Sequence, residues 1–140
     1  MTDEQKQKRA WLSRAKTAEQ YMIALEKQIK KDKKDNRLIA FLSEFDDPDV
    51  PELKEKVTHS IQEQRTQVEE LIAIRDEIKK AILKVHDDKL QTVLTRHYLL
   101  YETIEVVAEN MDCDRRTIQR NHKKALDKIV MHKVKGESAE

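Results

Sequence analysis

The chain has 140 residues, of which 39% are charged and 38% hydrophobic, and its formal net charge is +1. Its single glycine excludes glycine-rich phosphate loops and dinucleotide-binding fingerprints, which need several close backbone approaches. Its two prolines, few for this length, and its many Glu, Lys, Gln, Leu and Ala residues predict an all-α fold. One cysteine and no apolar run of membrane-spanning length predict a cytoplasmic protein without a membrane partner.

Residues 1–31 predict a helix with a narrow apolar seam. The seam residues recur at steps of four and three, as in a coiled coil: Trp11, Ala15, Ala18, Met22, Leu25 and Ile29. We expect this helix to end in the lysines of residues 30–34, because cations favour a helix C-terminus. A short apolar helix over residues 38–45 should follow. Two prolines and several acids at 46–51 then predict a corner.

From Glu52 a long helix is expected, with a regular heptad pattern. Its seam contains Val57, Ile61, Gln64, Val68, Leu71, Arg75, Ile78, Ile82 and Val85. The seam can pair with the first helix of the same chain or with the same helix of a second chain. We expect a homodimer, because bacterial helix-turn-helix proteins commonly read paired half-sites. The dimerisation residues would be Val57, Ile61, Val68, Leu71, Ile78 and Ile82, within a helical coiled-coil region over residues 1–86.

His86, Asp87 and Asp88 mark the joint to the C-terminal part, where Asp87 or Asp88 should cap the next helix. The adjacent His and Asp residues lack a second set of metal ligands. Cys113 lies between two acids, which disfavour a reactive thiolate. We therefore expect no catalytic residue, no metal ion, no cofactor and no enzymatic activity. The last ten residues, 131–140, should form a frayed tail.

Residues 103–129 predict two helices that meet at a tight turn. Ile104, Val107 and Ala108 share one face. The polar residues Asn110, Asp112 and Asp114 interrupt the pattern, and Asp114 is a suitable N-cap for the second helix. The apolar spacing then resumes, at Ile118, Ala125, Leu126 and Ile129. This arrangement predicts a helix-turn-helix domain over residues 87–130, whose second helix can enter the major groove of DNA.

Charge is sorted between the two halves of this region. Residues 86–113 carry six acids and two bases, a net −4, whereas residues 114–135 carry eight bases and two acids, a net +6. Arg can be bidentate to guanine and Gln to adenine, so the candidate base readers are Arg115, Arg116, Gln119 and Arg120, with Lys123 and Lys124 farther along for the backbone. The expected DNA-binding residues are Arg115, Arg116, Thr117, Gln119, Arg120, Lys123 and Lys124.

The same residues carry a family resemblance. Residues 91–129 resemble the helix-turn-helix of region 4 of bacterial sigma factors and, more closely, the ArpU-type phage transcriptional regulators. The similarity rests on the run at residues 96–100, on Thr103 before a helix that contains Val107 and Ala108, and on residues 117–120 followed by 124–126. Asp112 stands where the family often has Gly, so a left-handed backbone is expected there, which Asp tolerates better than most residues.

The resemblance implies promoter-type DNA binding by a phage or prophage protein, in some relatives next to RNA polymerase. The sequence thus predicts a sequence-specific transcriptional regulator that reads double-stranded DNA with residues 114–130. The alternative function is that of a helical adaptor whose long helices bind RNA polymerase or another protein.

Overall fold

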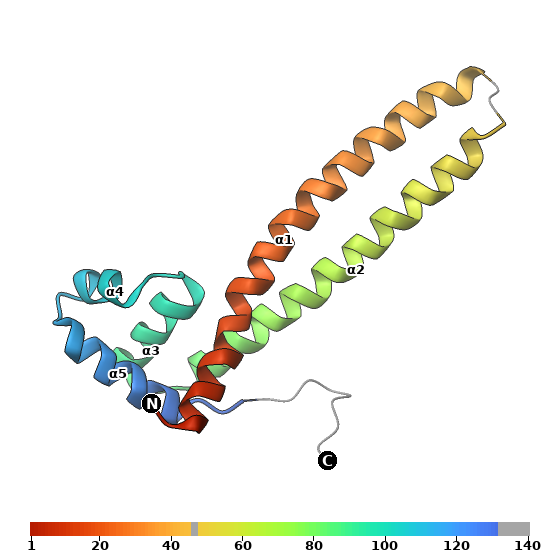
Figure 1. The fold of residues 1–140 in the computed structure, drawn as a ribbon. Helices are drawn as coiled ribbons and strands as arrows, with labels where there is room; N and C mark the ends of the chain where they lie inside the picture. Colours follow the sequence, from red (N-terminus) through yellow and green to blue (C-terminus); the bar gives the residue numbers. More distant parts are fainter. Residues whose placement is uncertain (46–47, 132–140) are drawn as a thin grey trace, which may run out of the picture. The chain divides into compact units, whose positions relative to one another are not determined.

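The computed structural model of the chain describes residues 1–45 and 48–131. Every regular element in these residues is helical, which confirms the prediction of an all-α fold. The elements in chain order are α1 (Asp3–Leu42), a 3-10 helix (Ser43–Phe45), α2 (Val50–Leu83), α3 (Asp88–Leu94), a π-helix (Thr95–Leu99), α4 (Ile104–Asn110) and α5 (Arg115–Lys128), as Figure 1 shows.

The chain divides into two compact units, whose boundaries differ from those expected. The core unit contains Met1–Thr17 and Ile74–Glu140, and the hairpin unit contains Ala18–Ala73. The expected boundary near residue 86 therefore falls inside the core unit, because both ends of the long-helix region contribute to the same hydrophobic core as α3 and α5. Most of the expected tail, residues 132–140, lies outside the described residues.

The first helix is longer than expected. α1 continues without interruption through the basic cluster to Leu42, so residues 30–34 lie within a helix and not at its end. No Gly or Pro breaks this stretch. The seam also continues beyond Ile29, through Asp32 and Ile39, which are both buried. The expected separate helix at residues 38–45 is therefore the last turn of α1 and the 3-10 helix. Of the expected corner, Asp46 and Asp47 lie outside the described residues.

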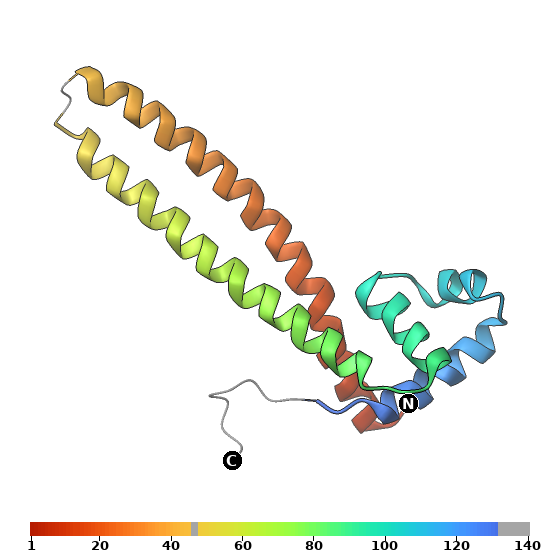
Figure 2. The same ribbon diagram turned by 180° about the vertical axis from the view of Figure 1, so that it is seen from behind.

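In the hairpin unit, residues 18–42 of α1 and 50–73 of α2 run antiparallel and side by side in both views of Figures 1 and 2. Asp32 fixes their register, because its carboxylate accepts hydrogen bonds from Gln28 Nε2 at 3.1 Å on α1 and from Ser60 Oγ at 3.0 Å on α2. The heptad pattern allowed α2 to pair with the first helix of its own chain or with a second chain, and in this structure it pairs within its own chain.

The assigned dimerisation residues are packed within one chain. Ile78 and Ile82 have no exposed surface and belong to the core unit, and Ile61 in the hairpin unit is only 9% exposed. Val57, Val68 and Leu71 are half-buried, and Arg75 is exposed, so it does not interrupt a packed seam. In this conformation the three buried isoleucines of the seam present no surface to a second chain, whereas the dimerisation role of the six residues stays a prediction.

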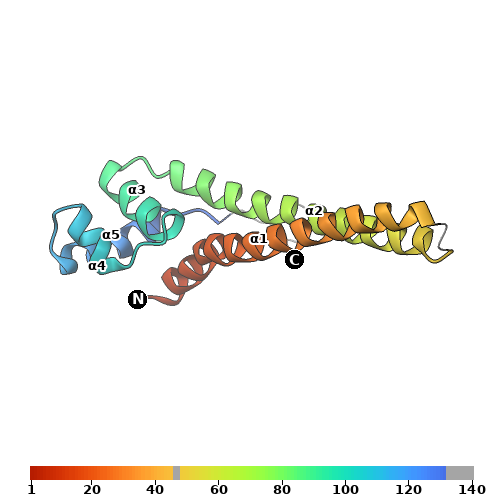
Figure 3. The same ribbon diagram turned by 90° about the horizontal axis from the view of Figure 1, so that it is seen from above.

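The core unit is held by two apolar clusters. The larger one joins the first turns of α1 and the end of α2 to α3 and α5: Leu12, Ala15, Ile78, Ile82, Val85, Leu90, Leu94, Tyr98, Ala125, Leu126 and Ile129. Leu12 lies at its centre, whereas the expected Trp11 is only half-buried, with the Arg14 guanidinium 5.0 Å from its ring. The smaller cluster contains Val93, Val107, Ala108 and Ile118, beneath the turn between α4 and α5. Figure 3 shows α3, α4 and α5 gathered beside the N-terminus of α1.

Candidate nucleic-acid interface

The turn between α4 and α5 has the expected geometry. The Thr103 side chain caps α4 by accepting a hydrogen bond from the Val106 amide, and Asp87 caps α3 in the same way by accepting from Leu90. Asp112 has a φ of 52°, the left-handed conformation expected at this position. The Cys113 amide then donates to the Ala108 carbonyl at 2.9 Å, which closes the turn. The turn is tight, since α5 starts only five residues after α4 ends.

Asp114 does not cap α5 as expected. It occupies the N-cap position with extended backbone, but its side chain makes no capping hydrogen bond. Its backbone carbonyl instead accepts from the Ile118 amide at 3.1 Å, the first bond of the helix. The backbone geometry of the turn therefore sets the start of α5 without help from the carboxylate.

α5 separates its buried and exposed residues by face. Ile118, His122, Ala125 and Leu126 are buried against the core unit. Six of the seven expected DNA-binding residues are exposed, and Thr117 is half-buried. The exposed six are Arg115, Arg116, Gln119, Arg120, Lys123 and Lys124. The structure thus brings the expected base readers together on one solvent-facing helix.

Arg115 differs from the other cations because it contacts the preceding helix. Its Nη2 lies 3.0 Å from Glu105 Oε1 on α4, and both side chains remain more than half exposed. An exposed ion pair of this kind contributes little stability, but it limits the positions that the guanidinium takes. Arg115 is therefore the most constrained of the four expected base readers.

The buried His122 anchors α5 from the opposite side, a role that the sequence pattern did not reveal. Its Nε2 and the Tyr98 hydroxyl are hydrogen-bonded at 2.6 Å, inside the larger cluster. Burial, aided by the positive charges that His97 and Arg9 can carry, lowers the pKa of His122 to about 4. Burial also raises the pKa of Tyr98 above its ordinary value. Both groups are therefore neutral at pH 7, as a buried hydrogen-bonded pair requires.

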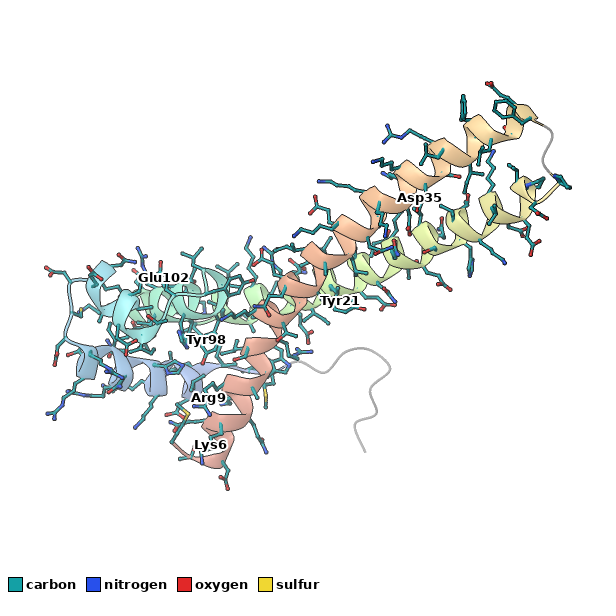
Figure 4. All side chains as sticks on the ribbon, turned by 45° about the horizontal axis from the view of Figure 1, so that its top comes forward. Lys6, Arg9, Tyr21, Asp35, Tyr98 and Glu102 are labelled. Atoms are coloured by element: carbon teal, nitrogen blue, oxygen red, sulfur yellow. The ribbon has the colours of Figure 1, made fainter. Side chains whose placement is uncertain are left out.

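The N-terminus of α1 holds the other end of α5, a second contact that sequence reasoning missed. Gln5 Nε2 donates to the Lys123 carbonyl at 3.3 Å and to Asp127 Oδ1 at 3.0 Å, and Lys8 Nζ donates to the Asp127 carbonyl at 3.4 Å. Figure 4 shows Lys6 and Arg9 on the same part of α1, beside α5. These contacts use the last turns of α5 and leave the side chains of its first turns open to solvent.

The sequence does indicate how α1 begins, although not that Gln5 contacts α5. Thr2 and Gln5 form a reciprocal capping box at the start of α1, with bonds of 3.1 and 2.9 Å, and the Thr-x-x-Gln spacing predicts such a box. The contact of Gln5 with α5 spans 118 residues, and no local pattern predicts it.

Within residues 1–45 and 48–131, no three His, Cys, Asp or Glu side chains gather closely enough to hold a metal ion. None of the helices described combines the length and apolar character needed to cross a bilayer. The candidate interface is the cationic face of α5, on which six expected DNA-binding residues are exposed.

In comparison with known proteins, no family model, no curated protein and no solved structure matches the chain.

Proposed function

We propose that the chain is a sequence-specific DNA-binding transcriptional regulator that inserts α5 into the major groove of double-stranded DNA. The observation that carries this proposal is the exposed row of Arg116, Gln119 and Arg120 on a helix that starts from a tight turn. A recognition helix places its N-terminal residues against base edges, and these three residues lie in the first two turns of α5. The resemblance of residues 91–129 to phage regulators supports a phage or prophage origin.

The charge of α5 supports the proposal. This helix of 14 residues carries six bases and one acid, whereas the whole chain has a net charge of only +1. Phosphate contacts supply most of the affinity for duplex DNA through counterion release. Lys123 and Lys124 lie one to two turns beyond the base readers, so they are suited to the phosphates that flank the groove.

The core unit holds α5 in position before any DNA is bound. Its inner face is anchored by the Tyr98–His122 hydrogen bond and its C-terminal end by Gln5 and Lys8. A helix fixed at both positions loses little conformational freedom on binding, which favours affinity. The protein needs no chemical step for this function, because docking is an equilibrium between free and bound states.

The salt dependence of binding tests this function. If the six bases of α5 each neutralise one phosphate, the logarithm of the association constant should fall with the logarithm of salt concentration with a slope of about −5. Fluorescence anisotropy with a labelled duplex measures the slope. Lys124→Ala should reduce its magnitude by about 1. The matched control, Lys79→Ala on the exposed side of α2, should leave it unchanged.

A flat salt response would contradict the proposal. It would favour the alternative function, a helical adaptor in which α5 and the long helices contact RNA polymerase or another protein.

A further inference from the structure

The turn of the hairpin unit exposes a group of large apolar side chains that we call the tip patch. Its members are between 44% and 67% exposed, and they are Leu38, Phe41, Leu42, Phe45 and Leu53. The Phe41 and Phe45 rings pack edge to face, with their centroids 5.5 Å apart. Exposed large apolar residues that gather on one part of a surface mark an interaction site, and these five flank one turn.

Four of these residues form one stripe along α1 and the 3-10 helix. Leu38, Phe41, Leu42 and Phe45 follow one another at spacings of three, one and three residues, which places them on one side of a helix. The neighbouring Ile39 is buried in the hairpin, so the stripe lies on a different side of α1 from the contact with α2. The packing within the chain therefore leaves the stripe uncovered.

Two blocks of opposite charge flank the tip patch. Residues 30–37 contain five bases and two acids, a net +3. Residues 44–55 contain six acids and one base, a net −5. In the described residues of both blocks, every Lys, Arg and Glu side chain is exposed. The surface thus carries a basic band, an apolar stripe and an acidic turn in that order along the chain.

We infer that the tip patch is a homodimer interface and that its occupant is the tip of a second copy of this chain. A surface with both charges on either side of an apolar centre is complementary to itself when two copies lie antiparallel about a two-fold axis. An axis between Leu38 and Phe41 brings Leu38 of one copy to Phe41 of the other. The same arrangement brings Glu44 of each copy to Lys34 of the other.

The charge pattern argues against other occupants. An acidic protein or an anionic membrane would be attracted by the basic band but repelled by the exposed acids Glu44, Asp49, Glu52 and Glu55. A basic partner would meet the opposite conflict. A second copy satisfies both blocks at once, and it does so without using the seam of α2.

Sedimentation equilibrium of the full chain tests the interface. The wild type should show a concentration-dependent mass that reaches twice 16.6 kDa. Phe41→Glu should raise the dimer dissociation constant about tenfold or more, because it places a charge in the buried centre of the interface. The matched control is Ile72→Glu, which changes a residue that is 52% exposed on α2 away from the tip and should leave the mass unchanged.

A charge exchange tests the pairing of the two blocks. Lys34→Glu and Glu44→Lys should each weaken the dimer, because each places like charges opposite one another, and the double variant should restore it. Both side chains are exposed, so these substitutions should leave the fold intact. They therefore test the interface even if Phe41→Glu lowers the helix content seen by circular dichroism. A monomeric wild type, or a dimer that is indifferent to all of these changes, would overturn the inference. Neither result bears on DNA binding by α5.

Discussion

Replacing Arg116 or Gln119 by Ala is expected to reduce the preference for a target duplex over a random duplex by roughly 5- to 150-fold. A bidentate contact to a base edge contributes about 1–3 kcal/mol of discrimination, and each 1.4 kcal/mol is a factor of about ten. Both side chains are exposed in the first two turns of α5, where a recognition helix contacts bases. Competition binding assays with the selected sequence and with random DNA measure the ratio directly.

Lys124→Ala is the matched control, since it removes a cation from the same helix. It should weaken binding to target and random DNA by the same factor, because phosphates carry no sequence information. The assignment of Arg116 and Gln119 as base readers is wrong if their substitution lowers affinity equally for every sequence.

Acidification from pH 7 to pH 4 is expected to destabilise the core unit by about 3 kcal/mol through His122 alone. Burial lowers the pKa of this imidazole from 6.5 to about 4 in the folded chain, and each pKa unit corresponds to about 1.36 kcal/mol. Below pH 6.5 the unfolded chain binds a proton that the folded chain excludes. The contribution to stability is therefore complete above pH 6.5 and is lost progressively as the pH falls towards 4.

Urea unfolding at pH 7 and pH 4 measures this effect when wild type and His122→Gln are compared. Glutamine does not titrate but keeps a polar group near the Tyr98 hydroxyl. All other ionisable groups are shared, so the wild type should lose about 3 kcal/mol more than the variant between the two pH values. Equal losses would show that protonation of His122 does not oppose folding.

The sequence predicted the helix-turn-helix in detail because its signals are local. Asp87, one of the two residues expected to cap α3, does cap it, and α4 begins directly after Thr103 as expected. Asp112 adopts the left-handed turn conformation. The apolar spacing in α5 identified its buried face. Asp114 is the exception, since a capping residue type at the right position need not form the bond when the backbone geometry already starts the helix.

The long helices were predicted less well, because a heptad pattern specifies a face but not its partner. The seam of α2 pairs within the chain, where Asp32 and Ser60 set the register. The end of α1 was misplaced because a cluster of lysines resembles a helix terminus, although Asp32 keeps the seam continuous through it.

The residues that hold α5 in place are far from it in the sequence, so sequence patterns did not identify them. Gln5 and Lys8 hold α5 from the other end of the chain, and no periodicity of either segment predicts that contact. His122 occupies a position on the buried face of α5, but the sequence does not reveal Tyr98 as its partner across 24 residues.

Selection of duplexes from a random pool by the full chain, followed by footprinting of the enriched sequence, tests the central claim most directly. If α5 reads the major groove, one motif should emerge, with protection centred on it, and Arg116→Ala should relax the selection at particular positions of that motif. A pool that remains random after repeated selection, with no protected region on any duplex, would contradict the claim that the cationic face of α5 recognises DNA sequence.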